Sequence, residues 1–392
     1  MTPAARIAAA IEVLDSILAG AAGEKALTNW ARRCRYAGSG DRAAVRDHVF
    51  DAQRRRRSFA WLGRAATGRG LMTGWAHASG IDTKVLFSGE KYAPEPLSEN
   101  EAAGGDLADA PRAVRLDIPD WLLALFDRDY GAQADAILTT LQVRAPVFLR
   151  VNLPRYDRAA AAQLLAEDGI STKPHALARS ALEVLKNPRR VAKSQAYQQG
   201  LVELQDAASQ AVVEYLTLTD GQRVLDFCAG GGGKSLAMAA AAKVTVTAHD
   251  VDVKRMIDLP PRAKRAGVKI DAASLAELNG QRFDLVLCDV PCSGSGAWRR
   301  SPEAKWALTQ QRLATLQATQ AHILDEAQEL VAESGILAYT TCSLLHDENR
   351  TQVDRFLHRN AKWELLRDRM LTPVHGGDGF YTALLTRAFN RS

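Results

Sequence analysis

The stretch Val224–Ala240, VLDFCAGGGGKSLAMAA, indicates the type of fold that much of the chain adopts. An apolar run that predicts a buried strand is followed by four glycines, Gly230–Gly233, and then by an alanine-rich run that predicts a helix. Glycines at such a junction let the backbone approach a ligand closely. The stretch therefore predicts a strand–turn–helix unit, and the question is what lies on the turn.

The glycine run is open to three interpretations. A phosphate-binding P-loop needs the pattern G-x-x-x-x-G-K-[ST]; Gly233, Lys234 and Ser235 fit its end, but Cys228 stands where its first glycine belongs. A glycine-rich turn without function is the second interpretation, although four glycines cost backbone entropy. The third is the first turn of a Rossmann-type fold, in which a cofactor lies against the backbone and the helix N-terminus.

The Rossmann interpretation predicts an acid about 20 residues further on, where it holds the ribose hydroxyls. Asp250 ends the run KVTVTAHD, 20 residues after Gly230, and Asp271 ends the next short strand-like run. Acids without an obvious pyrophosphate clamp suit a nucleoside cofactor that carries no phosphate. S-adenosylmethionine is the commonest such ligand.

Strand-like and helix-like segments alternate from about residue 205 onward. The strand-like runs are continuously apolar, which is typical of a parallel sheet covered by helices on both faces. The longest expected helix spans about 303–333. We expect an α/β catalytic domain over 205–392, built on a doubly wound Rossmann-like sheet, with ligands beyond the carboxyl ends of its strands. The expected strands are 223–229, 243–250, 268–271, 283–291, 335–343 and 381–389.

Two cysteines follow two of these strands. Cys292 stands in CDVPCSGSG and Cys342 in YTTCSLL, each just past the end of its strand. If the strands are neighbours, about 4.8 Å apart, both thiols face one crevice beside the cofactor. Cysteine is also a common buried residue, and we apply that interpretation to Cys34, Cys228 and Cys288. No metal site is expected, because zinc would need a fourth ligand and tighter spacing.

A thiol beside a methyl donor suits methylation of a pyrimidine. Carbon 5 of the ring is a poor nucleophile, and a thiolate added at C6 makes it able to attack a methyl group, after which the C5 proton and the thiolate leave. A carboxyl group near N3 would stabilise the adduct. Asp289, three residues before Cys292, is the candidate, although an Asp at a strand end can equally cap a turn.

The first 70 residues carry most of the positive charge. They hold 13 Lys and Arg and six acidic residues, whereas the net charge of the whole chain is +5. The cluster Arg54–Arg57 can be a solvated helix face, but so many arginines in one segment favour polyanion binding. Apolar residues at helical spacing over 4–20 and 41–62 predict a helical module.

Composition indicates two further regions before the catalytic domain. Pro, Gly and acids over 88–112 are typical of a linker or long loop. A helical patch and a strand–helix–strand pattern over about 145–186 follow. We expect a helical RNA-binding domain and linker over 1–110, and a helical connector with a small α+β RNA-binding subdomain over 111–204.

Export and membrane insertion are not expected. No window approaches 18 uninterrupted apolar residues, and Glu12 and Asp15 stand where a signal peptide needs an apolar core. Five cysteines without a CxxC pair are typical of reduced thiols. We expect a cytoplasmic monomer that does not bind a membrane.

Four motifs, DFCAGGGGKS, DVPCSGSGAWRRSPEAKW, TTCSLLHDEN and GDGFY, together resemble one family. In this order, over about 145–390, they resemble the Sun/Fmu-type RNA (cytosine-5) methyltransferases. Upstream, GDRAAVRDHVFDAQRRRR resembles part of the helical NusB-like RNA-binding domain that precedes the catalytic part in that family.

The resemblance implies a role for each motif. The family's nucleophile is the cysteine of Thr-Cys-Ser, here Cys342, and the Pro-Cys thiol, here Cys292, assists product release. DNA cytosine methyltransferases use the Pro-Cys thiol as nucleophile and generally lack the other, so both together favour RNA. S-adenosylmethionine is implied as cofactor, held by Cys228, Ala229, Gly230, Gly231, Gly232, Gly233, Lys234, Asp250, Asp271 and Asp289.

One position of the cofactor turn departs from the family. The usual turn reads Ala-Ala-Pro-Gly-Gly-Lys, and Gly231 replaces the proline. The replacement removes a fixed backbone angle and predicts a more mobile turn.

Four arginines are candidate RNA contacts. Arg299 and Arg300 follow Trp298 near the expected mouth of the site, where guanidinium groups can hold phosphates or stack on a base; a plain surface pair is the other interpretation. Arg54 and Arg55 belong to the basic cluster of the helical domain. The target base must be single-stranded or extruded to reach the thiols.

The function expected from the sequence is S-adenosylmethionine-dependent formation of 5-methylcytosine in RNA through a covalent Cys–C6 adduct. The resemblance implies 16S ribosomal RNA as the partner. The alternatives are the same chemistry on tRNA, and an RNA-binding ribosome-assembly factor that keeps the fold without catalysis.

Overall fold

The protein divides into two compact units in a computed structural model that describes residues 1–388. The first unit comprises Met1–Arg144 and the short segment Trp298–Ala307. The second comprises Ala145–Ala297 and the chain from Leu308 onward. No helix in these 388 residues is long and apolar enough to cross a membrane.

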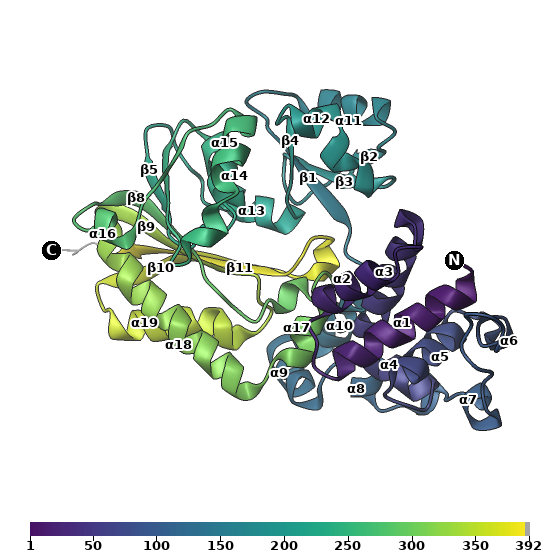
Figure 1. The fold of residues 1–392 in the computed structure, drawn as a ribbon. Coiled ribbons are helices and arrows are strands. Elements are labelled where there is room, and N and C mark those ends of the chain that lie inside the picture. Colours follow the sequence, from purple (N-terminus) through teal and green to yellow (C-terminus); the bar gives the residue numbers. More distant parts are fainter. Residues whose placement is uncertain (389–392) are drawn as a thin grey trace. The chain divides into compact units, whose positions relative to one another are not determined.

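The first unit consists of helices and loops, as the sequence predicts (Figure 1). Its first helix begins at Pro3, and the hydroxyl of the N-cap Thr2 accepts a hydrogen bond from Ala5 N. Its helices are α1 Pro3–Leu18, α2 Gly23–Arg33, α3 Ser39–Arg54, α4 Arg56–Leu62, α5 Gly68–Ala78, α6 Thr83–Leu86, α7 Glu99–Ala103, α8 Arg112–Arg115, α9 Asp120–Tyr130, α10 Ala134–Leu141 and α17 Pro302–Ala307. The apolar faces of these helices form its core, with residues such as Leu14 of α1 and Trp30 of α2.

The helical unit ends at Arg144, beyond the domain boundary expected near residue 110. The segment 88–112 packs on this unit instead of linking two domains. Arg69 on α5 donates hydrogen bonds to the carbonyls of Glu95 and Pro96, both at 3.0 Å. Of the two expected forms, a linker or a long loop, these contacts favour the long loop.

A small four-stranded antiparallel sheet opens the second unit, in the order β2-β3-β1-β4. The expected strand–helix–strand pattern is confirmed and gains two short strands. Its core contains Leu149, Leu165 and Leu182, all fully buried. The elements are β1 Val147–Val151, α11 Arg158–Glu167, β2 Thr172–Pro174, β3 Ala181–Val184, α12 Gln195–Gln198 and β4 Val202–Leu204.

The catalytic domain is built on a seven-stranded sheet in the order β10-β11-β9-β8-β5-β6-β7. The five strands from β9 to β7 are parallel, whereas β11 is antiparallel to β9 and β10. The expected Rossmann-like sheet is confirmed in a mixed form. The strands are β5 Arg223–Asp226, β6 Thr245–Ala248, β7 Ile270–Ala272, β8 Phe283–Asp289, β9 Val331–Thr341, β10 Trp363–Leu371 and β11 Phe380–Arg387; Phe389 of the last expected strand lies outside the described residues.

Helices cover both faces of this sheet, which explains the continuously apolar strands. In β8, Leu285 and Leu287 pack in the cluster that contains Met238 of α14, whereas Val286 packs in the cluster that contains Leu324 of α18. The helices of this domain are α13 Ala207–Tyr215, α14 Gly233–Ala241, α15 Leu259–Ala266, α16 Leu275–Leu278, α18 Gln310–Ala327 and α19 Arg350–Arg359.

The long helix expected over 303–333 is divided between the two units. Its first part, α17, belongs to the helical unit, where Lys305 Nζ donates to the Arg54 carbonyl at 3.0 Å and Trp306 Nε1 donates to the Gln53 carbonyl at 2.7 Å. Its second part, α18, belongs to the catalytic domain. The segment Trp298–Ala307, which follows the Pro-Cys motif, thus belongs to the helical unit.

Candidate active site

The turn between β5 and α14 needs glycine at two positions. Gly230 and Gly232 have φ values of +51° and +74°, in the left-handed region that favours glycine. A Cβ on Gly232 would also lie 2.2 Å from Leu259 Cδ1. Gly230 N donates to Asp250 Oδ2 at 2.8 Å, so the acid after β6 holds the turn. The turn and Asp250 therefore come together as predicted.

Lys234 is engaged by a carboxylate beside the turn. Its ammonium lies 2.6 Å from Asp289 Oδ2 at the end of β8 and 4.8 Å from the ring centroid of Phe380. Burial lowers the pKa of Lys234, but the charge and hydrogen bond of Asp289 outweigh that effect and leave the pKa above its usual value. The lysine is thus committed to Asp289, which argues against a phosphate cradle.

The two predicted thiols meet at the ends of adjacent strands. Strands β8 and β9 are parallel neighbours, with Asp289 opposite Thr340, and Cys292 Sγ lies 3.4 Å from Cys342 Sγ. The hydrogen bond to Cys342 and burial raise the pKa of Cys292 well above that of an ordinary thiol. Cys292 is therefore held as a thiol, able to donate its hydrogen to Cys342.

Glu348 joins the loops that carry the two thiols, and the sequence analysis assigned it no role. Its fully buried carboxylate accepts from Ser293 N at 2.8 Å, from the hydroxyls of Ser293 and Ser343, and from Gln320 Nε2 at 3.0 Å. Ser293 and Ser343 directly follow the two cysteines. Glu348 stands in the quoted motif TTCSLLHDEN, but nothing in its spacing indicates burial.

The remaining cysteines are not placed for catalysis. Burial raises the pKa of the thiols of Cys228 and Cys288, which makes the thiolate form less accessible. Cys34 lies in the helical unit. These positions agree with the expectation that all three are structural.

Asp271 does not lie at the level of the cofactor turn. It is the middle residue of β7, opposite Thr247, and its half-exposed side chain pairs with Lys269 at 3.2 Å. Asp250 comes three residues after Thr247, so Asp271 lies about 10 Å further back along the sheet. Asp271 lies one residue before the carboxyl end of β7, and its contact with the cofactor stays a prediction.

Two of the four arginines expected to contact RNA are buried. Arg54 and Arg299 expose 4% and 3% of their surface, and Arg54 Nη1 donates to the Arg299 carbonyl at 3.2 Å. Their burial corrects the expectation that they bind RNA. Arg300 is exposed and Arg55 is half-buried, with its guanidinium 4.6 Å from the ring centroid of Phe59. Arg300 and Arg55 stay candidates.

Acidic partners neutralise part of the basic N-terminal segment. Each of these ion pairs lies within the helical unit; four of the acids are already in the count for the first 70 residues, and the other two, Asp120 and Glu101, offset two further positive charges. The pairs are Arg6–Asp41, Arg33–Glu12, Arg46–Glu24, Arg54–Asp51, Arg57–Asp120 and Arg69–Glu101.

Asp226, at the end of β5, is a buried acid that the sequence analysis did not single out. Its Oδ2 accepts from Ser235 Oγ at 2.6 Å, while its buried Oδ1 has no hydrogen-bond partner in the described chain. The pKa of Asp226 is raised to about 7, mainly by burial. The hydrogen bond from Ser235 lowers the pKa, and the charge of the nearby Asp289 raises it. The carboxyl group is thus protonated in mildly acidic solution.

The raised pKa makes the stability of the catalytic domain depend on pH. The pKa of Asp226 in the folded protein lies above its unfolded value of about 3.9. The free energy of unfolding is therefore highest below about pH 4 and falls as the pH rises through 7, by up to about 4 kcal/mol. We expect Asp226→Asn to flatten the fall in melting temperature between pH 5 and 8. Scanning calorimetry at pH 5, 6, 7 and 8 measures this, with Asp220→Asn at an exposed position as control. Identical pH profiles for wild type and Asp226→Asn would contradict it.

Comparison with protein families gives two matches. Residues 213–386 match the family described as 16S rRNA methyltransferase RsmB/F. Residues 118–192 match the ferredoxin-like domain described for RsmF/B-like methyltransferases. The first match contains the turn and both thiols, and the second contains most of the small antiparallel sheet.

Relatives named Ribosomal RNA small subunit methyltransferase B are similar over most of this chain. The protein from Erwinia tasmaniensis is 34% identical over 284 residues, which covers 69% of this chain and 66% of that relative. The one from Escherichia coli O6:K15:H31 is 33% identical over 287 residues, with the same coverage. The chain thus spans 66% of the length of the curated relatives it matches.

Solved structures share the fold. PH0851 has a TM-score of 0.75 at 21% identity and covers 99% of both chains. NSun6 from Pyrococcus horikoshii, solved with SFG, has a TM-score of 0.62 at 17% identity and covers 69% of this chain and 98% of its own. These likenesses confirm the expected fold class.

Proposed function

The chain belongs to the 16S rRNA methyltransferase RsmB/F family, and on that premise we propose that it forms 5-methylcytosine in RNA with S-adenosylmethionine as methyl donor. The observation that carries the proposal is the thiol pair: Cys342 Sγ lies 3.4 Å from Cys292 Sγ. The ion pair of Lys234 on α14 with Asp289 at the end of β8 lies at the same edge of the sheet.

The electrostatics of the pair support Cys342 as the nucleophile. The raised pKa of Cys292 keeps its proton on that sulfur, so Cys292 can donate a hydrogen bond to a Cys342 thiolate. The charge of Cys342 is also among the groups that raise the pKa of Lys234, which identifies the ammonium as a nearby counter-charge. The geometry thus places Cys292 as the hydrogen-bond partner of Cys342.

The cofactor turn suits a nucleoside that carries no phosphate. Lys234, the cation that a P-loop would offer to phosphate, is paired with Asp289. We propose that the turn Cys228–Gly233 and Asp250 hold the cofactor, with Asp289 beside its reactive end. S-adenosylmethionine supplies an electrophilic methyl group when it is bound.

The proposed reaction begins with a bond from Cys342 Sγ, as a thiolate, to C6 of cytosine, while N3 takes a proton from a carboxyl group, for which Asp289 is the candidate. Carbon 5 becomes nucleophilic and takes the methyl group. The C5 proton must then pass to a base, after which the electrons of the C5–H bond restore the C5–C6 double bond and expel Cys342 as a thiolate, and N3 returns its proton to the carboxylate.

Cys292 is the candidate for that base. Its sulfur lies 3.4 Å from Cys342 Sγ, the atom that is bonded to C6 in the adduct. As a thiolate, Cys292 could take the C5 proton from that side, in agreement with the release role implied by the family.

The substrate class rests on the relatives, which are named for the small-subunit ribosomal RNA. We propose 16S rRNA as the substrate. We propose further that Arg300 and Arg55, the two arginines of the expected four that are not buried, contact RNA.

Mass spectrometry of nucleosides tests the function directly. Purified protein with S-adenosylmethionine should produce 5-methylcytidine in unmodified 16S rRNA and little in tRNA. Preference for tRNA would overturn the ribosomal substrate. Absence of 5-methylcytidine from both RNAs, together with no cofactor binding by calorimetry, would favour the non-catalytic assembly factor.

A further inference from the structure

Side chains from outside the cofactor turn hold two of its carbonyl groups. The Gly231 carbonyl accepts a hydrogen bond from Arg262 Nη1 on α15. The Gly233 carbonyl accepts from Arg150 Nη1 at 2.9 Å and from Gln205 Nε2 at 3.2 Å. Arg150 lies on β1 and Gln205 directly follows β4, so the small antiparallel sheet contributes two of the three donors.

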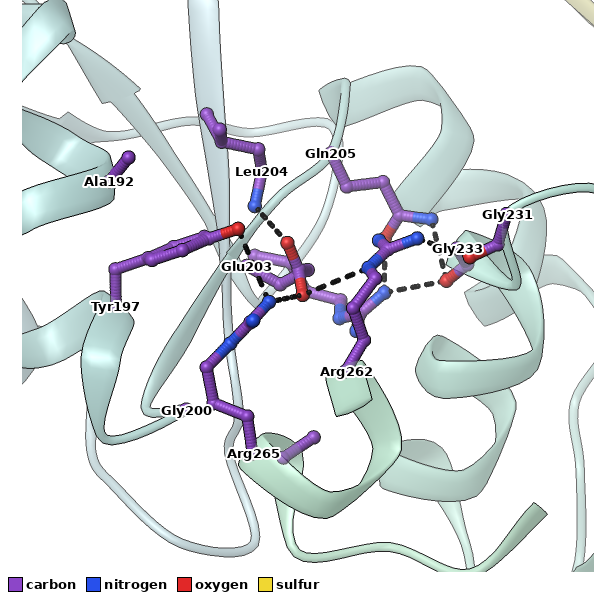
Figure 2. Close-up of polar contacts among 12 residues, drawn as sticks. Ala192, Tyr197, Gly200, Glu203, Leu204, Gln205, Gly231, Gly233, Arg262 and Arg265 are labelled. Atoms are coloured by element: carbon purple, nitrogen blue, oxygen red, sulfur yellow. Dashed lines mark hydrogen bonds and ion pairs between the residues drawn. The ribbon is translucent and has the colours of Figure 1, made fainter. Parts of the chain in front are cut away.

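Glu203 on β4 connects these donors. It lies opposite Arg150 in the strand register. Its carboxylate accepts from Arg262 Nε at 3.4 Å and from Arg265 Nη2 at 2.7 Å, and Figure 2 shows it between the two arginines. The Glu203 side chain is only 11% exposed, so solvent screens these pairs less than it would at the surface.

The helix that carries Arg262 is itself attached to the small sheet. Asn152 Nδ2 donates to the Ala266 carbonyl at 2.9 Å, and Arg155 Nη1 donates to the Arg265 carbonyl at 3.0 Å. A Cβ on Gly200 would lie 1.9 Å from that same Arg265 oxygen. The two backbones are thus in close contact, so the position of the helix that carries Arg262 is fixed relative to the small sheet.

Arg150 is unusual as a buried cation. It exposes 7% of its surface, and burial lowers its pKa to about 10. A buried guanidinium is costly unless it is well bonded. Its partners are the side-chain oxygen of Gln205 and the Gly233 carbonyl. The burial of this charge beside the turn indicates that its hydrogen bond to the Gly233 carbonyl is a specific contact.

We propose that Glu203, Arg262 and Arg150 act as positioning residues for the cofactor turn. They hold the carbonyls of Gly231 and Gly233 from the small sheet and from α15, and so supply the rigidity that Gly231 does not have. The inference rests on the proposed function, because it concerns how the turn receives S-adenosylmethionine.

Loss of these contacts should weaken the binding of the cofactor. A turn that is not held must be ordered when the cofactor binds, and this cost weakens the apparent affinity. The thiols follow β8 and β9, so their chemistry changes less. Loss of the contacts should raise the KM for S-adenosylmethionine more than it lowers kcat.

The variants Arg262→Ala and Arg265→Ala form a matched pair. Both remove one guanidinium from α15 and one partner of Glu203, and their side chains are equally exposed, at 21% and 22%. Only Arg262 contacts the Gly231 carbonyl. We expect Arg262→Ala to raise the Kd and KM for S-adenosylmethionine about tenfold, with Arg265→Ala within about twofold of wild type.

Hydrogen exchange gives a second readout that does not depend on activity. Peptides that cover 227–234 should exchange faster in Arg262→Ala than in Arg265→Ala or wild type, without cofactor present. Equal exchange and equal Kd in the two variants would overturn the proposal, because any effect would then come from the lost charge alone.

A rescue variant separates rigidity from general damage. Gly231 lies outside the left-handed region, and in the described part of the chain, its sequence neighbours aside, Arg262 Nη1 at 3.3 Å is the one atom within 4 Å of a Cβ there. In the Arg262→Ala background, Gly231→Ala should restore two- to fivefold of the lost affinity, since alanine restricts the free turn by about that factor. No recovery would contradict rigidity as the cause.

Calorimetry with the wild-type protein distinguishes failure of the proposed function from failure of the proposed positioning role. If wild type does not bind S-adenosylmethionine, the proposed function fails. If wild type binds it and Arg262→Ala binds it equally well, the function stands and the positioning role is wrong.

Discussion

Replacing Cys342 by alanine is expected to abolish methyl transfer, with a loss on the order of 10³-fold or more, because it removes the sulfur that is proposed to form the bond to C6. Replacing Cys292 should instead leave the protein covalently attached to RNA, since the step that expels Cys342 is slowed. Transfer of a labelled methyl group measures the first effect, and a retarded protein–RNA band on a denaturing gel measures the second.

The control for this pair is Cys34→Ala, which removes a thiol from the helical unit. It should retain wild-type turnover and form no stable adduct. The reverse pattern, with turnover retained in Cys342→Ala and adduct formation lost in Cys292→Ala, would make the Pro-Cys thiol the nucleophile. The raised pKa of Cys292 argues against that outcome.

Glu348→Gln is expected to lower kcat about 100-fold while the KM for S-adenosylmethionine changes little. The amide of Gln keeps one accepting oxygen and replaces the other by an NH2 group, so it cannot accept from Ser293 N and from both serine hydroxyls as the carboxylate does. Because these serines adjoin the two cysteines, the sulfur atoms shift, and a displacement near 1 Å costs about that factor. Steady-state kinetics with each substrate varied in turn measure the split.

A milder variant covers the case in which Glu348→Gln does not fold. Ser343→Ala removes one donor to Glu348 and should lower kcat about five- to tenfold. Asp354→Asn, at an exposed position of α19, is the control and should match wild type. A rise in KM with unchanged kcat in either Glu348→Gln or Ser343→Ala would contradict a role in placing the thiols.

Local patterns were sufficient for the parallel part of the sheet and insufficient for its edge. Strands β5, β6, β8 and β9 are apolar runs, and each was predicted. Strand β10 was missed because it is charged and irregular: its register with β11 shifts between Leu365 and Arg367. Edge strands carry such charges and bulges, so the alternation that identifies a strand is lost.

Exposure of charged residues could not be judged from the sequence. The cluster Arg54–Arg57 predicts a basic face, yet Arg54 is buried and contacts the Arg299 carbonyl, 245 residues away. Likewise, Asp271 stands near the expected place in the sequence, but the pairing of β6 with β7 places it level with Thr247. Burial and register depend on which distant segments pack together.

The sequence by itself determined the strand–turn–helix unit at Val224–Ala240 and the place of the thiols at strand ends. These follow from contiguous residues, because glycine alone tolerates the left-handed angles of the turn and apolar runs of that length form buried strands. Only the tertiary structure decided the partners: Lys234 with Asp289, Glu348 with both serines, and Arg262 with the Gly231 carbonyl. Such contacts depend on side-chain geometry between elements far apart in the chain, which local propensity does not encode.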